Sequence, residues 1–330
     1  MNDGLLNIGV IGLGVMGQRM LARLATHPRL RATTVWDAQA TAIATTLQAY
    51  PQLRAADSAE ALIATPGLHS LYIATPPAPH MALSELAFDA GLAVFCEKPL
   101  TVDFGAARAC IARIEAQGQR AAVNFALASS KGLALLQSQF GAGAERPLGD
   151  LQSIDLELAF AAWPRPWQAA AGAWLGERIE GGFSREVLSH FIFALQRVLG
   201  PAQVQSSQVE YPNDGVSAEI GLQAELQAAG VPLRIHGKVG GEQADLNRMR
   251  WQAAAGQTQL QEWFSQIEVR DAAGQLLPQE LSNGDLRLHG QRDQLDQWVA
   301  LIEGRPHGLP GYAEALAVQE TIEALLQGRG

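Results

Sequence analysis

A glycine-rich turn near the start of the chain limits the fold more than any other feature. Residues 5–11 form a short apolar run rich in β-branched side chains, which predicts a strand buried on both faces. The sequence Gly-Leu-Gly-Val-Met-Gly follows at residues 12–17, and a stretch with apolar side chains at helical spacing comes next. A G-x-G-x-x-G between a strand and a helix is typical of dinucleotide-binding folds, where the helix N-terminus faces a pyrophosphate. The residues that we expect to contact the dinucleotide here are Gly12, Gly14, Val15, Met16 and Gly17.

An acidic residue follows at the distance that a ribose contact requires. Asp37 lies 20 residues beyond Gly17, at the end of a predicted strand over residues 30–36. A carboxylate there accepts hydrogen bonds from the adenosine ribose and repels a 2′-phosphate. The next four residues, 38–41, include no arginine that could bind a 2′-phosphate. This pattern predicts NAD as the cofactor in preference to NADP. Asp37 could also cap a helix that begins near Ala38, an alternative that is compatible with the ribose contact.

Length and composition predict a two-domain globular protein. A single core stops growing at about 250–300 residues, and this chain has 330. We expect a soluble cytoplasmic protein, because no apolar run reaches the ~20 residues of a membrane span and no signal peptide is recognisable. The two cysteines, Cys96 and Cys110, are too few for a disulfide framework or a cysteine-based zinc site, and we predict no metal. The net charge of −9 argues against a nucleic-acid partner.

The first 125 residues alternate strand-like and helix-like segments, which predicts a doubly wound parallel sheet. The strand predicted over residues 69–74 runs into a rigid loop with three prolines, at the edge where such sheets bind cofactors. The strand predicted over residues 92–95 delivers Glu97-Lys98-Pro99 to the same edge. The helices expected here cover residues 40–49, 59–64, 81–90 and 103–117, and a last strand covers residues 120–125.

The second part of the chain predicts an antiparallel sheet with one apolar face. Apolar and polar residues alternate over 154–160, 216–227 and 233–239, and acids on the second strand would face bases on the third. Residues 183–199 predict an α-helix that covers the apolar face, with Glu186 and His190 one turn apart on its polar side. A final amphipathic helix is predicted over residues 311–326.

A loop with aromatic side chains and arginine precedes that helix. Trp163, Arg165 and Trp167 stand among prolines, and Trp174 lies beyond them. Such a loop can form a lid that stacks on a sugar ring, or it can close the edge of the second core. The sequence supports both interpretations equally.

Three motifs in this order resemble the Gfo/Idh/MocA oxidoreductases, the family of glucose–fructose oxidoreductase and inositol dehydrogenase. They are the glycine turn with Asp37, the Glu-Lys-Pro at 97–99, and the Gly-Gly-x-x-x-Glu-x-x-x-His at 181–190. The resemblance covers nearly the whole chain, including residues 311–315. It implies a Rossmann domain over residues 1–125 and a substrate and oligomerisation domain over residues 126–330. The last helix would pack back toward the first domain.

The resemblance also implies roles for individual residues. Lys98 would be the catalytic lysine, with a cis bond to Pro99, His190 the catalytic histidine, and Glu186 would stand where the family usually has aspartate. Two departures bear on the substrate: Leu188 replaces a common glycine, and residues 124–130 lack a frequent arginine. Further residues implied at the cofactor are Thr75, Pro76, His80, Glu97 and Lys98. The residues expected at the substrate are Trp163, Arg165, Trp167 and Arg185.

These implications predict an NAD-dependent dehydrogenase that acts on a secondary hydroxyl of a sugar, polyol or related cyclic compound. Its partner would be that small molecule, and the chain would assemble as a homodimer or homotetramer. An NADPH-dependent reductase of keto-sugars or diketones is one alternative. A non-catalytic regulator that senses a dinucleotide or a sugar is another, although the presence of both Lys98 and His190 argues against it.

Overall fold

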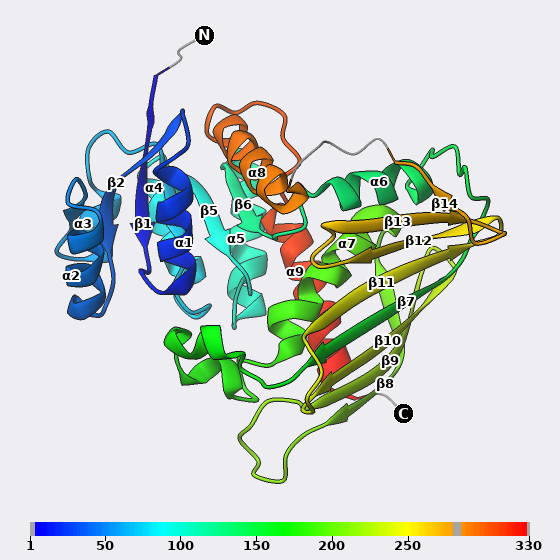
Figure 1. Cartoon of the computed structure of the whole chain (residues 1–330). Helices are drawn as coiled ribbons and strands as arrows, with labels where there is room; N and C mark the ends of the chain where they lie inside the picture. Colours follow the sequence, from blue (N-terminus) through cyan, green and yellow to red (C-terminus); the bar gives the residue numbers. More distant parts are fainter. Residues whose placement is uncertain (1–3, 280–284, 329–330) are drawn as a thin grey trace. The chain divides into compact units, whose positions relative to one another are not determined.

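The computed structural model describes residues 4–279 and 285–328, which form two compact units (Figure 1). The first unit consists of the described residues up to 125 together with residues 292–316. The second consists of the described residues between 126 and 291 together with residues 317–328. Residues 292–316 therefore belong with the N-terminal sheet, although they follow the second sheet in the sequence.

The first unit contains a parallel six-stranded sheet in the order β3-β2-β1-β4-β5-β6. This confirms the predicted doubly wound fold, and only the short strand β3 was not expected. The strands are β1 Leu6–Ile11, β2 Leu30–Trp36, β3 Arg54–Ala55, β4 Ser70–Ile73, β5 Ala93–Glu97 and β6 Ala121–Asn124. The helices between them are α1 Val15–Leu24, α2 Ala40–Ala49, α3 Ala59–Ile63, α4 His80–Asp89 and α5 Phe104–Gln117.

The strand order reverses between β1 and β4. From β1 the chain continues to β2 and β3 on one side of β1, and β4, β5 and β6 then follow on its other side. Open α/β sheets bind ligands beyond the carboxyl ends of the strands at such a switch point. The loops that leave β1, β4 and β5 at this edge are residues 12–14, 74–79 and 98–103.

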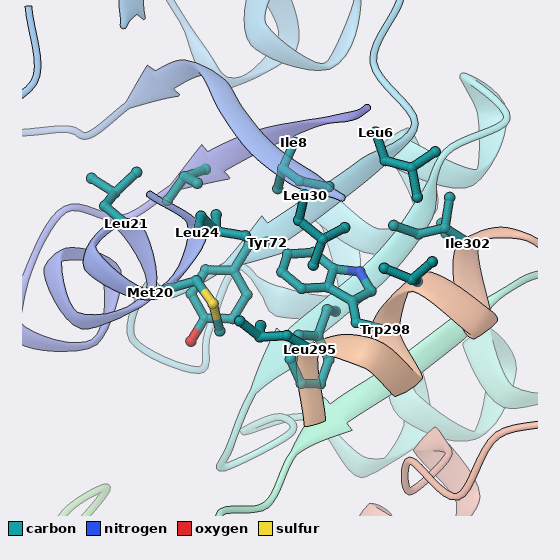
Figure 2. Close-up of a cluster of buried hydrophobic side chains, with 14 of the residues drawn as sticks. Leu6, Ile8, Met20, Leu21, Leu24, Leu30, Tyr72, Leu295, Trp298 and Ile302 are labelled. Atoms are coloured by element: carbon teal, nitrogen blue, oxygen red, sulfur yellow. The ribbon is translucent and has the colours of Figure 1, made fainter. Parts of the chain in front are cut away.

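An unpredicted helix, α8 (Leu286–Ile302), completes the core of the first unit. Its Trp298 is fully buried and lies next to Tyr72 (Figure 2). The centroid of its ring is 5.9 Å from that of Tyr72 and 5.0 Å from that of Phe95. The indole N–H donates to the hydroxyl of Ser70 at 3.0 Å, so the one polar atom of the ring is satisfied. Trp298 therefore packs α8 directly onto β4 and β5.

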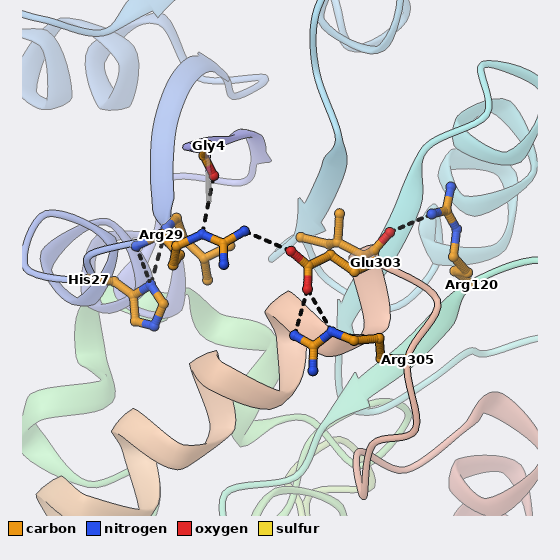
Figure 3. Close-up of polar contacts among 8 residues, drawn as sticks. Gly4, His27, Arg29, Arg120, Glu303 and Arg305 are labelled. Carbon is orange, nitrogen blue, oxygen red and sulfur yellow. Dashed lines mark hydrogen bonds and ion pairs between the residues drawn. The ribbon is translucent and has the colours of Figure 1, made fainter. Parts of the chain in front are cut away.

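Charged side chains fasten the segment that follows α8 (Figure 3). Arg29 donates to the carboxylate of Glu303 at 2.7 Å and to the carbonyl of Gly4 at 3.2 Å. Arg305 donates to the other oxygen of Glu303, and Arg120 donates to the carbonyl of Ile302. These contacts join residues 302–305 to the start of β2 and to the residue before β6.

The second unit contains the predicted, mostly antiparallel sheet. Its eight strands have the order β14-β13-β12-β11-β7-β10-β9-β8, with β7 and β10 as a parallel pair. The strands are β7 Leu151–Phe160, β8 Ala202–Glu210, β9 Gly221–Ala228, β10 Val231–Val239, β11 Leu246–Ala253, β12 Gly256–Gln261, β13 Gln266–Asp271 and β14 Leu276–Leu277. The helices are α6 Lys131–Phe140 and α7 Ser189–Leu199, with 3₁₀ turns at Pro166–Ala171 and Ala173–Gly176. The last helix, α9 Tyr312–Leu326, belongs to this unit from residue 317 onward. Among the described helices none combines the length and apolar character of a membrane span.

The hairpin of β9 and β10 has the predicted charge match at one position. Arg234 lies opposite Glu225 in the register, with their charged atoms 3.9 Å apart. His236 and Lys238 face uncharged residues, Gln223 and Gly221. Among the three basic residues of β10, only Arg234 therefore faces an acid across this hairpin.

The prediction of an unbroken strand over residues 216–227 is wrong at its beginning, because β9 begins only at Gly221. Residues 216–218 instead bond to the segment before Gly181: Arg178 donates to the carbonyl of Val216, and Ala218 donates to that of Gly176, both at 2.8 Å. Val216, predicted on the apolar face, is 66% exposed. Glu219, predicted on the polar face, is buried and accepts a hydrogen bond from the Ser184 N–H at 2.7 Å. That bond compensates in part for burying the carboxyl.

The prediction of one α-helix over residues 183–199 is also wrong in its first turn. Residues Ser184–Leu188 are π-helical, and the α-helix α7 begins at Ser189. Two anchors hold the π-helical turn: Glu219 binds the Ser184 N–H, and Arg185 pairs with Glu323 on α9 at 2.6 Å. Both anchors act on the first two residues of the turn, where the wider π-helical geometry accommodates an extra residue.

Candidate functional site

The glycine turn after β1 has the geometry of a phosphate-binding loop. Gly12 has a φ of +91°, and a Cβ on it would lie 2.4 Å from the carbonyl oxygen of Ala74. A Cβ on Gly17 would lie 2.0 Å from the carbonyl oxygen of Gly12, so only glycine allows the turn to pack against the helix. A Cβ on Gly14, in contrast, would meet no atom of the described chain within 4 Å, which leaves space for a ligand. Gly14 is the N-cap of α1, so the N–H groups of the first helical turn point toward this space.

Asp37 is held against this turn. Its Oδ2 accepts a hydrogen bond from the Leu13 N–H at 2.7 Å, and its Oδ1 accepts one from the Gln39 N–H at 2.8 Å. Gln39 is the N-cap residue of α2, so the alternative that Asp37 caps this helix is wrong. Each carboxylate oxygen keeps a second lone pair for a ribose hydroxyl. The structure thus brings together the glycine turn and the acid that the sequence singled out.

The loop after β4 contains the second set of predicted cofactor residues. The hydroxyl of Thr75 is buried and has no hydrogen-bond partner among residues 4–279 and 285–328, while Pro76 is exposed. A buried hydroxyl without a partner is uncommon and fits a polar group supplied by a ligand. Together with the open space at Gly14, it indicates that these residues fit a dinucleotide.

His80 joins the loops after β4 and β5. Its side chain is fully buried, with Nε2 3.0 Å from the carbonyl oxygen of Thr75 and Nδ1 3.2 Å from that of Leu100. Burial lowers the pKa of His80 below its usual value. In the described chain, then, His80 links the loop at Thr75 to the loop that carries Lys98. Its contact with a cofactor stays a prediction.

A buried polar cluster lies at the end of β5, directly before Lys98. The carboxylate of Glu97 accepts hydrogen bonds from the hydroxyl of Tyr72 and from the side-chain amide of Asn124, the latter at 2.7 Å. Burial, and next the charge of Glu97, raises the pKa of Tyr72 well above its ordinary value. Lys98 itself is half-buried, and its bond to Pro99 is cis, as the resemblance implied. Hydrogen bonds therefore hold the carboxylate of Glu97, the last residue of β5, and Lys98 is the first residue after the strand.

Tyr72→Phe tests this cluster by removing the hydroxyl that donates to Glu97. Hydrogen bonds to charged groups contribute about 1.5–3 kcal/mol, so we expect the free energy of unfolding at neutral pH to fall by about that amount. The raised pKa of Tyr72 also stabilises the wild type below the ordinary tyrosine pKa near ~10, and this part is lost as the pH rises further. The alkaline loss of stability should thus be shallower in Tyr72→Phe. Urea unfolding at neutral and alkaline pH, with Tyr50→Phe as control, measures both effects, and a variant with wild-type stability throughout would contradict them.

In the second unit, His190 lies on the first turn of α7 and is only 5% exposed. Its Nδ1 accepts a hydrogen bond from the backbone N–H of Ala126 at 3.3 Å. Glu186 precedes it in the π-helical turn and is partly exposed. The two predicted catalytic side chains of this unit thus come from one continuous helical segment.

Trp263 is a residue of this region that sequence reasoning missed. It lies in the turn between β12 and β13, and its ring meets the imidazole of His190 edge to face, with centroids 5.3 Å apart. The sequence could not have indicated this contact, because Trp263 follows His190 by more than seventy residues and belongs to no recognisable motif.

The aromatic loop and Arg185 are engaged within the second unit. Trp163 packs on Phe160 and donates from its indole N–H to the carbonyl of Leu175 at 2.9 Å, which supports the interpretation that it closes the core. The guanidinium of Arg165 lies over the ring of Trp167, which is 46% exposed. Arg185 binds Glu323 through two nitrogens and also donates to the carbonyl of Gly181. Substrate contacts by Trp163, Arg165, Trp167 and Arg185 stay predictions.

Comparisons with known proteins agree with this geometry. The model of the family GFO_IDH_MocA, described as an oxidoreductase family with an NAD-binding Rossmann fold, matches residues 6–125. No curated protein sequence matches the chain.

Solved structures resemble both units at low sequence identity. The WlbA dehydrogenase from Chromobacterium violaceum, in complex with NADH and UDP-GlcNAcA, is 16% identical with a TM-score of 0.82, over 99% of this chain and 94% of that one. An oxidoreductase from Agrobacterium radiobacter, in complex with NAD+, L-tartaric acid and magnesium, is 17% identical with a TM-score of 0.80, over 98% and 95%. The UDP-N-acetylglucosamine 3-dehydrogenase GnnA from Acidithiobacillus ferrooxidans is 17% identical with a TM-score of 0.76, over 98% and 97%. At sequence identities this low, the structural similarity establishes a shared fold.

Proposed function

Because residues 6–125 belong to the GFO_IDH_MocA family of NAD-binding oxidoreductases, we propose that this protein is an NAD-dependent dehydrogenase. It oxidises a secondary hydroxyl of a sugar, a polyol or a related cyclic compound. The observation that carries the proposal is the hydrogen bond from the Leu13 N–H to Asp37, which holds this carboxylate next to the glycine turn. The sugar class is supported by the nucleotide-sugar names and ligands of two structural neighbours.

Each residue has a distinct task in this proposal. The N–H groups at the start of α1 bind the pyrophosphate, and Asp37 accepts hydrogen bonds from the adenosine ribose. When bound, NAD+ supplies the acceptor for the hydride that leaves the alcohol carbon. Lys98 accepts the proton of the hydroxyl, and the buried cluster of Tyr72, Glu97 and Asn124 keeps the strand end beneath it rigid.

The proposal is tested by the formation of NADH from NAD+ with a panel of sugars, inositols, sugar acids and nucleotide sugars. We expect at least one compound with a secondary hydroxyl to be turned over. Reduction of keto-sugars with NADPH, without any NAD+-dependent oxidation, would favour the reductase alternative instead. A protein that binds NAD+ and turns over none of these compounds would favour a regulator.

Asp37→Ser tests the preference for NAD. The substitution removes the charge that disfavours a 2′-phosphate and the acceptors for the ribose hydroxyls. Because a hydrogen bond to a charged group contributes about 1.5–3 kcal/mol, NAD affinity should fall by about 10- to 150-fold. NADP affinity should rise relative to it. Binding titrations of both cofactors measure this, with Asp37→Asn as the control that keeps an acceptor without the charge. A wild type that binds NADP as tightly as NAD would show that Asp37 does not discriminate.

A further inference from the structure

Both peptide groups that flank Gly14 in the glycine turn are held by one residue of α1, Gln18. Its backbone N–H donates to the carbonyl of Gly14 at 3.0 Å, and its side-chain amide donates to the carbonyl of Leu13 at 3.1 Å. Both peptides are trans, so each N–H points in the opposite direction to its C=O. The N–H groups of Gly14 and Val15, which belong to these two peptides, therefore point away from Gln18.

The N–H groups of the glycine turn divide into two kinds. The Gly12 N–H donates to the carbonyl of Trp36 at 2.9 Å. The Leu13 N–H donates to Asp37. The Gly14 N–H, in contrast, has no hydrogen-bond partner within the described part of the chain, and a Cβ on Gly14 would meet no atom there within 4 Å. An unpaired backbone donor beside open space, at the start of a helix, is suited to a phosphate oxygen.

The peptide between Leu13 and Gly14 needs an anchor because one of its residues is glycine. A flip of this peptide would turn its N–H away from the open space and direct its carbonyl oxygen there, where the oxygen would repel a phosphate. Such a flip changes φ of Gly14, now −69°, and glycine adopts positive φ values without steric cost. The flip would, however, break the hydrogen bond from the Gln18 side chain to the Leu13 carbonyl.

Thr46 on α2 fixes the orientation of the Gln18 amide. The hydroxyl of Thr46 donates to the carbonyl of Ala42 at 2.7 Å, so it can only accept from the Gln18 side chain, whose Nε2 lies 2.7 Å away. Both hydrogens of this amide nitrogen are then in use, one on Thr46 and one on the Leu13 carbonyl. Of the ten described residues of α2, only Thr46 is buried.

From this geometry we infer that Gln18 and Thr46 are positioning residues for the cofactor, because they hold the Leu13–Gly14 peptide with its N–H directed at the pyrophosphate. The inference rests on the proposed function and separates two tasks within the cofactor site. Asp37 discriminates between NAD and NADP at the ribose. Gln18 raises the affinity for the pyrophosphate, which both cofactors contain.

Titrations of NAD+ and NADP+, the weaker ligand measured by competition, test these two tasks. Gln18→Met removes the side-chain donors at nearly the same side-chain length, so both dissociation constants should rise by the same factor, about 3- to 10-fold. Their ratio should stay that of the wild type, whereas Asp37→Ser changes it. Thr46→Val should give a smaller rise and Thr46→Ser none, and Gln48→Met, at an exposed position of α2, is the matched control. An NAD+ dissociation constant within twofold of that of Gln48→Met, or a changed ratio in Gln18→Met, would overturn the inference.

The orientation of the peptide can also be observed without a cofactor. In the full-length protein with ¹⁵N-labelled glycine, the amide signal of Gly14 is assigned by its loss in Gly14→Ala. We expect one sharp signal in the wild type and in Thr46→Ser, and a second or broadened signal in Gln18→Met. A single sharp signal in Gln18→Met would contradict the anchoring role. A wild type that binds neither NAD+ nor NADP+ would refute the proposed function, while the Gly14 signal would still decide whether Gln18 holds this peptide.

Discussion

Lys98→Met should lower the turnover of the alcohol by about 10²–10⁴-fold, because the variant lacks the group that we propose accepts the hydroxyl proton. The affinity for NAD+ should change little, since the glycine turn and Asp37 are separate from this side chain. Lys98 leaves the end of β5 directly after Glu97, which Tyr72 and Asn124 hold by hydrogen bonds. The backbone of the strand end should therefore stay in place when the amine is removed.

The matched control for this prediction is the same substitution on the exposed face of the second sheet. The chain has three lysines, and Lys238 is exposed on β10. Lys238→Met should leave kcat and the NAD+ dissociation constant as they are. Steady-state kinetics and cofactor titrations on both variants make the comparison. Near-normal turnover by Lys98→Met would assign this lysine to a structural or solvated role.

Trp298→Ala should lower the free energy of unfolding by about 3–5 kcal/mol, the usual cost of removing a large buried aromatic ring. The substitution empties the space between α8, Tyr72 and Phe95 and leaves the Ser70 hydroxyl without its indole donor. Trp298→Phe keeps most of the ring and should cost less. Trp167→Ala is the control for the loss of a tryptophan at a half-exposed position.

Urea unfolding of the three variants measures this ranking. The decisive comparison is between Trp298→Ala and Trp167→Ala, since both lose the same side chain at different burial. Equal stabilities would contradict the assignment of residues 292–302 to the core of the first unit.

The sequence was sufficient where local signals and local structure coincide. The apolar run, glycine turn and helix at residues 5–24 predicted β1 and α1, because the glycines are needed by contacts within that unit itself. The helices predicted over residues 59–64 and 103–117 begin within one residue of the prediction for a similar reason: Ser58 and Asp103 cap them with their own side chains, at Ala61 N and at Ala106 N.

The sequence was insufficient where a distant partner decides the structure. Leu295, Val299 and Ile302 have helical spacing, but nothing local says that their helix returns to the first sheet. Glu219 stands at a position that the alternation assigns to solvent, but it is buried and accepts a hydrogen bond from the Ser184 N–H of another element. The same holds for the site: Lys98 and His190 could be proposed from motifs, whereas Ala126 and Trp263 matter through contacts that only the folded chain makes.

The fate of the hydrogen on the alcohol carbon tests the central proposal most directly. A substrate from the panel, deuterated at the carbon that bears the secondary hydroxyl, is incubated with the protein and NAD+, and the reduced cofactor is analysed by mass spectrometry. A dehydrogenase of the proposed kind transfers the deuterium to the nicotinamide ring, so the NADH should carry one deuterium. NADH that forms without deuterium would contradict hydride transfer from that carbon. The absence of any NADH with every sugar, polyol and cyclic alcohol would contradict the proposed function itself.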